Sequence, residues 1–361
     1  MPSRELHDVV DVPWENVVTT FAIVYSHVMD VLSDLLHRAR ARNALVRQLI
    51  QRPPWSLTFA DAPPLTVVTT LAGHASVRLD DVGTAPVRLA AGDIALITAP
   101  GRYTIADAPS TPPQVVIQGG KKHVIDGDEE APGTHWSLAP RTYGDGLPGA
   151  TIMLRGAYEL RGDVGDRLLD MLPPLAVVPS GPRTRAALDL LAAEVAHDEP
   201  GQDAVLDRLL DLVLVLALRA WCAGSERAPA WYQALADPAI GDALRLLHED
   251  PAHRWTVAEL ATKVGMSRAA FAARFRALAG EPPLTYLTGW RMTLGADLLR
   301  DTEATVSAVA HEVGYEDAFA FSVAFKRARG VSPSLWRRQI RDQGDLAAMT
   351  DEVIGSPPPP P

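Results

Sequence analysis

The sequence is poor in the residues that form covalent or metal cross-links. Cys222 is the only cysteine among 361 residues. A single cysteine excludes a disulfide within the chain and a thiolate zinc cluster. We therefore expect the fold to depend on packing alone, and with 47% hydrophobic residues the chain has enough apolar material for two or three domains.

Long hydrophobic runs without charge are also missing. The stretch from Val17 to Val31 contains His27 and Asp30, and Asp211 interrupts the apolar stretch from Leu209 to Leu218. Neither stretch has the length and flanking charges of a membrane span or a signal peptide. We expect a cytoplasmic protein that makes no membrane contact.

Motifs for catalysis are absent from the sequence as well. It contains no nucleophile elbow and no phosphate-binding loop, and His74, His123 and His135 lack the spacing of metal ligands. The sequence predicts no catalytic residues, no cofactor and no metal, and hence a protein that is not an enzyme.

The charge is distributed unevenly along the chain. The net charge is -10, yet residues 254–341 hold 13 Lys and Arg against 8 Asp and Glu, leaving 21 against 36 elsewhere. Positive charge is thus concentrated in one region, as contact with DNA phosphates requires. This balance predicts a nucleic-acid-binding domain attached to an acidic one.

One pattern occurs twice between residues 256 and 336. The copies align with an offset of 49 residues before the central turn and 50 after it, so one residue is added at the turn. The matching residues are Leu260, Ala261, Gly265, Phe271, Phe275 and Gly280 in the first copy, and Val309, Ala310, Gly314, Phe321, Phe325 and Gly330 in the second.

Each copy predicts a helix-turn-helix unit. Gly265 and Gly314 suit the positive φ that ends a helix, and Ser267 and Asp317 are good N-caps for the helix that follows. Phenylalanines four residues apart define one buried face of this second helix and leave the opposite face free. Such a free helix fits the DNA major groove.

With these features the region resembles the DNA-binding domain of the AraC/XylS family of bacterial transcription regulators. The resemblance implies an all-α domain over residues 236–341, in which a rigid helix from Leu284 to Leu299 joins the two units. Such a joint would hold the reading helices about 34 Å apart on one face of the duplex. The implied partners are promoter or operator DNA and RNA polymerase.

The resemblance also implies which residues contact DNA. Base edges would be approached by Ala269, Ala272, Ala273, Ala318, Phe319, Ser322 and Val323. Polar contacts would come from Ser267, Arg268 and Asp317 at the helix starts, and phosphate contacts from Arg276, Lys326, Arg327, Arg337 and Arg338. Because apolar side chains pack against thymine methyl groups, we expect a target rich in A·T steps.

The N-terminal half shows a different periodicity. Residues 1–50 are expected to form a loose tail and then helical structure from Val31 to Ile50. From Trp55 the hydrophobic residues alternate, which predicts short antiparallel strands in a small barrel or sandwich over residues 51–160. The polar loop 119–148 is expected to be a surface insertion, or else a cover for the barrel mouth.

The stretch from Val87 to Asp107 resembles the second motif of cupin barrels, especially of the sensor domains that precede AraC-type units. Tyr103 stands where metal-binding cupins have a histidine, so the resemblance implies a small-molecule sensor without a metal. The candidate ligand-binding residues are His74, Arg88, Arg102, Tyr103 and Gln118. Alternation also allows Arg88, Arg102, Tyr103 and Gln118 to be rim residues.

Residues 161–225 are expected to be helical and to form a homodimer contact. The helix around Leu209, Val213 and Leu216 is apolar nearly all round, which suits either a dimer interface or an internal core helix. Residues 226–235 are expected to be a linker, and residues 342–361 a disordered proline-rich tail.

The sequence thus predicts an α+β protein with a cupin-like barrel, a helical dimerisation segment and a double helix-turn-helix domain. We interpret it as a sequence-specific DNA-binding transcription regulator whose barrel senses an unknown small molecule. Two alternatives remain open, a metal-dependent cupin enzyme with a DNA-binding tail and a barrel that only dimerises.

Overall fold

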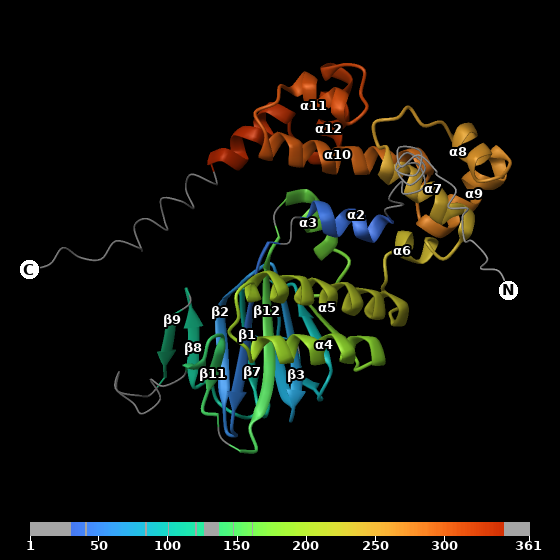
Figure 1. Ribbon diagram of the computed structural model, residues 1–361. Helices are drawn as coiled ribbons and strands as arrows, with labels where there is room; N and C mark the ends of the chain where they lie inside the picture. Colours follow the sequence, from blue (N-terminus) through green and yellow to red (C-terminus); the bar gives the residue numbers. More distant parts are fainter. Residues whose placement is uncertain are drawn as a thin grey trace, which may run out of the picture.

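The computed structural model describes residues 30–39, 42–83, 85–99, 101–119, 121–125, 137–146, 148–160 and 162–342. The expected N-terminal tail, the centre of the polar loop 119–148 and the proline-rich tail beyond Asp342 lie outside these residues. A two-sheet part and an all-helical part account for the described chain (Figure 1). The predicted α+β class is confirmed.

Two facing sheets, together called the barrel here, form the N-terminal part. One sheet has strand order β10-β11-β1-β12-β3-β6-β13 and the other β5-β4-β7-β2-β8-β9. The strands are β1 Arg42–Gln51, β2 Ser56–Ala62, β3 Leu65–Ala72, β4 Ala75–Leu79, β5 Val87–Leu89, β6 Ile94–Ile97, β7 Gly101–Ala106, β8 Val115–Gln118, β9 Lys121–Val124, β10 Ser137–Ala139, β11 Thr142–Gly144, β12 Thr151–Glu159 and β13 Leu175–Val178.

Alternation along the strands creates two apolar layers. Leu57, Phe59 and Ile105 face the other sheet and form one core with Val68 and Met153. The period-two pattern predicted from Trp55 onward is confirmed by β2 to β6, because side chains on a strand point alternately to opposite faces.

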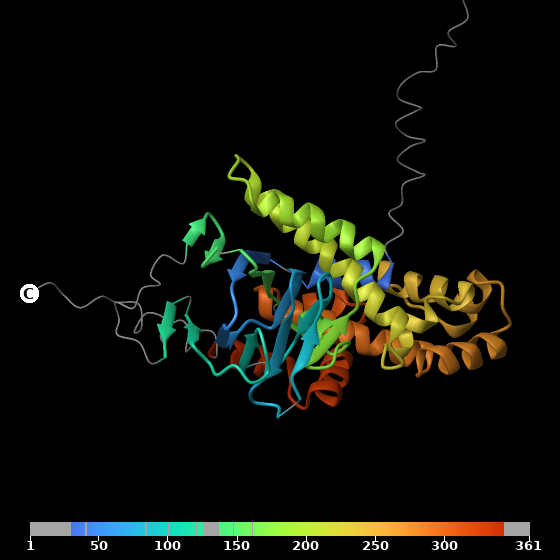
Figure 2. The same ribbon diagram turned by 90° about the horizontal axis from the view of Figure 1, so that it is seen from below.

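Helices α4 (Pro182–Val195) and α5 (Gln202–Gly224) cover the outer face of the seven-stranded sheet (Figures 1 and 2). The approach is close at Gly156 on β12, where an added Cβ would lie 2.6 Å from the methyl carbons of Leu210. Only glycine lets α5 pack against the sheet at this distance.

The helix expected from Val31 to Ile50 is wrong in its second half. Helix α2 spans Val31–Arg38, and the chain then forms β1. Strand β1 pairs with β12 along its length and with β11 on its other edge. These distant partners satisfy its backbone, so tertiary pairing overrides the helix-like spacing of leucines.

Two predicted domain boundaries also need correction. The barrel extends beyond residues 51–160 on both sides, because β1 precedes this range and β13 pairs with β6 from within the expected helical segment. The expected linker 226–235 contains helix α6 (Ala230–Ala234), in which Trp231 and Ala234 are buried. α6 packs against α9, so this segment belongs to the helical domain.

The remaining helices are α3 Gly162–Leu169, α7 Pro238–Glu249, α8 Val257–Lys263, α9 Arg268–Ala279, α10 Pro283–Asp301, α11 Val306–Glu312 and α12 Ala318–Arg329. Helix α10 is the predicted joining helix, with Trp290, Leu287 and Leu299 buried along it. α8 and α9 lie at one end of it, and α11 and α12 lie over the other (Figure 1). Helices α2 and α3 lie between α10 and the barrel.

Candidate functional site

The two predicted helix-turn-helix units are present with their expected local chemistry. Gly265 and Gly314 have φ of 70° and 83°. Ser267 Oγ accepts a hydrogen bond from Ala270 N at 3.3 Å, and Asp317 Oδ1 accepts one from Ala320 N at 2.8 Å. These caps start α9 and α12, the two reading helices, in equivalent places.

Each reading helix buries its phenylalanines and exposes the opposite face. Phe271, Phe275, Phe321 and Phe325 are all 0% exposed. The expected base-contacting residues are exposed or half-buried: Ala269, Ala272, Ala273, Ala318, Phe319, Ser322 and Val323. Phe319 is 79% exposed, so α12 presents a large apolar side chain to its surroundings.

The cations of this domain fall into two groups. Among the described residues, no acidic partner forms an ion pair with Arg268, Arg276, Lys326, Arg327 or Arg338, all of which are exposed. Arg274 instead pairs with Asp237 at 2.8 Å. The first group remains available to phosphates.

Arg337 differs from the other phosphate candidates. Its Nε donates to the carbonyl oxygen of Leu299 at 3.0 Å, and its Nη2 donates to that of Ala304 at 2.5 Å. It is half-buried and ties the end of α10 to the start of the second unit. These bonds give Arg337 a structural role that the sequence pattern did not reveal.

Arg291 holds the two units in a fixed relation. From α10 its Nε donates to Pro251 O at 2.7 Å and its Nη2 to His253 O at 2.8 Å, both just before α8. Its guanidinium carbon lies 5.7 Å from the ring centre of Tyr315 in the second unit. From its position on the joining helix, Arg291 therefore contacts both the first unit and the second unit.

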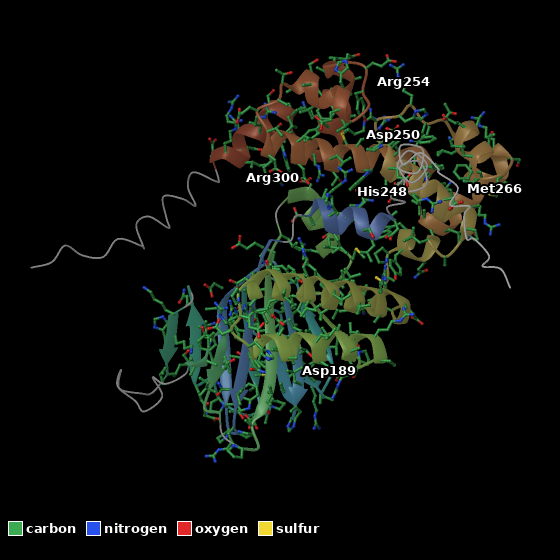
Figure 3. The ribbon with its side chains drawn as sticks, in the orientation of Figure 1. Asp189, His248, Asp250, Arg254, Met266 and Arg300 are labelled. Carbon is green, nitrogen blue, oxygen red and sulfur yellow. The ribbon has the colours of Figure 1, made fainter. Side chains whose placement is uncertain are left out.

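A buried hydrogen-bonded chain joins α2 to the helical domain. His248 Nδ1 lies 2.8 Å from Asp34 Oδ2, and His248 Nε2 lies 2.7 Å from the Tyr286 hydroxyl. The imidazole stacks on Trp290 with ring centres 4.4 Å apart. Figure 3 shows His248 on the side of the helical domain that faces α2.

Burial and hydrogen bonding determine which of these side chains are charged. Burial lowers the pKa of His248 despite the nearby Asp34 carboxylate. Burial alone would raise the pKa of Asp34, but hydrogen bonds from His248 and Arg38 outweigh it and lower that pKa. Asp34 is thus ionised and His248 favours the neutral form.

A second contact joins α3 to α10. Asp297 accepts hydrogen bonds from Asp163 N at 2.7 Å and Val164 N at 3.2 Å, so a carboxylate of the DNA-binding domain satisfies the first amides of a helix of the N-terminal domain. Asp163 forms an ion pair with Arg329 at the end of α12. Burial raises the pKa of Asp163 to about 6, Arg329 opposes the rise, and the Asp297 carboxylate adds to it.

The five ligand candidates do not converge. Tyr103 is 1% exposed and lies between the two sheets. Arg88, Arg102 and Gln118 are exposed and alternate with inward-facing residues on the other sheet face, and His74 is exposed in a turn. Alternation along the strands therefore places Arg88, Arg102 and Gln118 on the outer face of the sheet, away from the barrel interior.

The inner face instead carries a cationic residue that the sequence motifs did not indicate. Arg155 Nε donates to the Tyr103 hydroxyl at 2.6 Å, and its guanidinium carbon lies 4.4 Å from the ring centre of Phe59. Only the alternation of β12, with Met153 facing inward, could have signalled this orientation.

The dimerisation candidates also separate in the structure. Val213 is 0% exposed and belongs to the core beneath α5, so it is not available to a second chain. Leu209 and Leu216 are half-buried on the outer side of α5, where part of each side chain packs against the core. Leu212 and Val205, 42% and 43% exposed, lie on the same side.

Two general findings concern chemistry and membranes. Within the described ranges, no three His, Cys, Asp or Glu side chains are close enough to hold one metal ion. No helix in the described part of the chain is both long and apolar enough to cross a membrane.

Comparison with known proteins identifies the families that the two parts of the chain resemble. Residues 30–223 match the cupin family, and residues 260–339 match a helix-turn-helix domain family. An AraC-like transcription regulator of Streptomyces antibioticus is 35% identical over 318 residues, which cover 86% of this chain and 99% of its own. The transcriptional regulator AlkR of Acinetobacter baylyi is 35% identical over 182 residues, covering 49% of this chain and 60% of its own. The DNA-binding domain of AdpA, crystallised in complex with a target DNA, is 31% identical over 30% of this chain and 96% of its own, with a TM-score of 0.29.

A cupin domain followed by paired helix-turn-helix units defines a class of DNA-binding transcription regulators. The chain belongs to the AraC-like family of this class.

Proposed function

We propose that this regulator binds a specific DNA site as a homodimer, with each chain placing α9 and α12 in successive major grooves. The observation that carries the proposal is the pair of equivalent reading helices, whose exposed faces combine free cations with apolar side chains. Cations bind phosphates at any sequence, and base edges are contacted by the residues between them.

The reading faces favour thymine. Ala269, Ala273, Phe319 and Val323 supply methyl and ring surface but no hydrogen-bond donor. Thymine is the only base with a methyl group in the major groove, so an A·T-rich target fits these faces best. Ser267, Arg268 and Asp317 at the helix starts supply the polar contacts.

The homodimer would form through a stripe on α5. Val205, Leu209, Leu212 and Leu216 recur at alternating spacings of four and three residues and are exposed or half-buried. This spacing lines one side of a helix and is the pattern of a two-helix seam. Leu190 on α4, 58% exposed, extends the apolar surface.

The barrel would sense a small molecule, and α2 and α3 would transmit the signal to α10. The hydrogen bonds from His248 to Asp34 and from α3 to Asp297 couple the two parts directly. Thiol oxidation is a poor trigger, because Cys222 is buried and its pKa is raised to about 11 by that burial. The output would be altered contact with RNA polymerase in the cytoplasm.

We infer a regulator without catalytic activity, since its relatives are named as regulators. The rival interpretation, a metal-dependent cupin enzyme with a DNA-binding tail, would need a bound transition metal. Metal analysis of the purified full-length protein distinguishes the two, because a stoichiometric metal would favour the enzyme.

The DNA-binding proposal is tested by affinity as a function of salt. A duplex that the full-length protein binds is first selected from random sequences. The logarithm of the affinity for this duplex should then fall linearly as the logarithm of the salt concentration rises. Lys326→Gln and Arg327→Gln should each flatten this slope by about one phosphate contact. Arg88→Gln, which removes the same charge from the barrel surface, is the matched control. A wild-type affinity that does not change with salt would refute the proposal.

A further inference from the structure

Two arginines occupy paired positions on neighbouring strands, on the sheet face that lines the barrel interior. Arg47 on β1 and Arg155 on β12 are direct partners in the antiparallel register. Leu49 and Met153, two residues away on the same strands, lie in the core between the sheets, so both arginines project from the inner face. Both are half-buried. Like charges directly opposite on a sheet are destabilising unless an anion lies between them.

The Arg155 guanidinium is held in one orientation. Its Nε is bonded to the Tyr103 hydroxyl, and its plane lies over Phe59, which itself stacks on Tyr103 with ring centres 4.9 Å apart. Its two Nη atoms form no hydrogen bond to any described residue. A preorganised guanidinium with two free nitrogens matches the two oxygens of a carboxylate.

Arg47 likewise forms no ion pair with an acidic residue in the part of the chain that the structure describes. Its Nη1 donates to the carbonyl oxygen of the preceding residue, Val46, at 3.1 Å, and its guanidinium carbon lies 5.9 Å from the ring centre of Tyr143. Neither arginine forms an ion pair within the described ranges. Asp61 on β2 acts electrostatically on Tyr103, and its carboxylate accepts a hydrogen bond from Gly119 N at 2.6 Å.

The geometry points to a binding site for a small organic carboxylate at the half-buried pair Arg47 and Arg155. This inference rests on the proposed sensor function and names the class of its effector. Binding would place one negative charge beside two like cations and reduce their repulsion, which couples occupancy of the site to the stability of the β1–β12 pair.

The test uses thermal unfolding of the full-length protein with benzoate, phenylacetate and hexanoate, each beside its neutral amide, and with inorganic phosphate. At a hundredfold excess over its Kd, a binding carboxylate should raise the Tm by about 5 to 10 °C, and its amide should not. Arg155→Gln and Arg47→Gln should abolish the shift. Arg88→Gln and Arg102→Gln, on the outer face of the other sheet, should retain it. Without ligand, Arg47→Gln should match or exceed the Tm of the wild type, because it removes one of two like charges.

The other outcomes each overturn the inference. Equal shifts with amides would show a neutral pocket and leave the sensor function intact, whereas a shift with phosphate alone would replace carboxylate by phosphate. The arginines could instead pair with acidic residues of the chain itself. In that case no probe would raise the Tm, and Arg47→Gln would lower it as much as amide substitutions at Asp126, Asp128, Glu129 and Glu130 do. The sensor function fails separately, if no compound that binds the barrel changes the affinity for DNA.

Discussion

The reading faces of α9 and α12 consist of side chains that offer few hydrogen bonds. Phe319 and Val323 are 79% and 46% exposed, and alanines occupy the corresponding face of α9. A large apolar side chain so exposed is common where a partner covers it. Under the proposed function, discrimination between bases would therefore come largely from methyl contacts and from DNA shape.

Replacing Val323 with arginine should change the base preference. Arginine can donate two hydrogen bonds to guanine, a contact worth about 1 to 3 kcal/mol of discrimination. Val323→Arg should bind more tightly and prefer G at one position in a selection from random duplexes. Leu335→Arg, which adds the same charge at an exposed site beyond α12, should add affinity without a base preference. Several strict guanine requirements in the unmodified protein would contradict our interpretation.

Arg337 and Arg338 should respond differently to the same substitution. Arg337→Gln loses two hydrogen bonds to carbonyl groups, and each bond from a charged donor contributes about 1.5 to 3 kcal/mol. We expect a clear loss of stability in denaturant unfolding. Arg338→Gln should leave stability unchanged and flatten the salt dependence of DNA binding by about one contact. Equal effects of the two variants on both measurements would show that this division is wrong.

Asp163 should make the contact between α3 and α12 dependent on pH. Its pKa is about 6 in the folded protein, above the ordinary aspartate value of 3.8, so the folded state binds the proton more strongly than the unfolded chain does. Ionisation of this carboxylate lowers the free energy of unfolding. The loss reaches its maximum as pH rises above 6 and disappears as pH falls through 6 toward 4. Asp163→Asn should raise the Tm by a few degrees at about pH 8 and by less at about pH 5. A larger gain at the lower pH would contradict this sign.

Among the elements, α5 has two sides with different roles. Val213 and Leu210 face the sheet and are fully buried, whereas Leu212 and Leu216 lie on the outer side. An apolar composition all round the helix did not distinguish a core helix from an interface helix. The structure shows a core side and an exposed side on one helix.

The double variant Leu212→Glu and Leu216→Glu should convert a dimer into a folded monomer. Both glutamates would lie on the outer side of α5, where like charges of two chains would meet. Mass measurement by light scattering and circular dichroism would record this result. Val213→Asp, which buries a charge in the core, should instead unfold the barrel. A double variant with unchanged dimer mass would place the interface elsewhere.

Helix α2 is a short element that depends on a distant partner. Asp34→Ala removes the carboxylate that accepts from both His248 and Arg38. Because Asp34 and His248 are each 2% exposed, the loss should cost about 3 kcal/mol of unfolding free energy. Asp189→Ala, which breaks an exposed ion pair with Arg185 on α4, should cost less than about 1 kcal/mol. Denaturant unfolding measures both losses. Equal losses would show that the buried hydrogen bonds of Asp34 and His248 do not stabilise the contact between α2 and the helical domain.

Across the molecule as a whole, the cupin domain contacts the joining helix, α7 and the C-terminal end of α12 rather than the exposed face of either reading helix. α3 packs on α10, and Arg300 lies at this contact, close to Gly162 (Figure 3). A change in the barrel that moves α2 or α3 would thus reach α10, which also carries Arg291 between the two units. Under the proposed sensing function, these contacts would carry the effect of a bound effector to the DNA-binding domain.

Local signals in the sequence were sufficient to predict the two helix-turn-helix units and the helix that joins them. A capping side chain, a glycine with positive φ and phenylalanines one turn apart each act within a few residues, and their repetition makes the pattern specific. The barrel strands from β2 to β6 were also predictable, because alternation is a property of neighbouring residues.

The features that depend on distant partners were settled by tertiary packing alone. β1 is a strand because β12 and β11 satisfy its backbone, and Arg155 rather than Arg88 or Arg102 faces the barrel interior because β12 presents that side to Tyr103. The pairing of Asp34 with His248 spans 214 residues. No local pattern encodes such a contact, because its energy arises only when two separately folded elements bury their polar groups against each other.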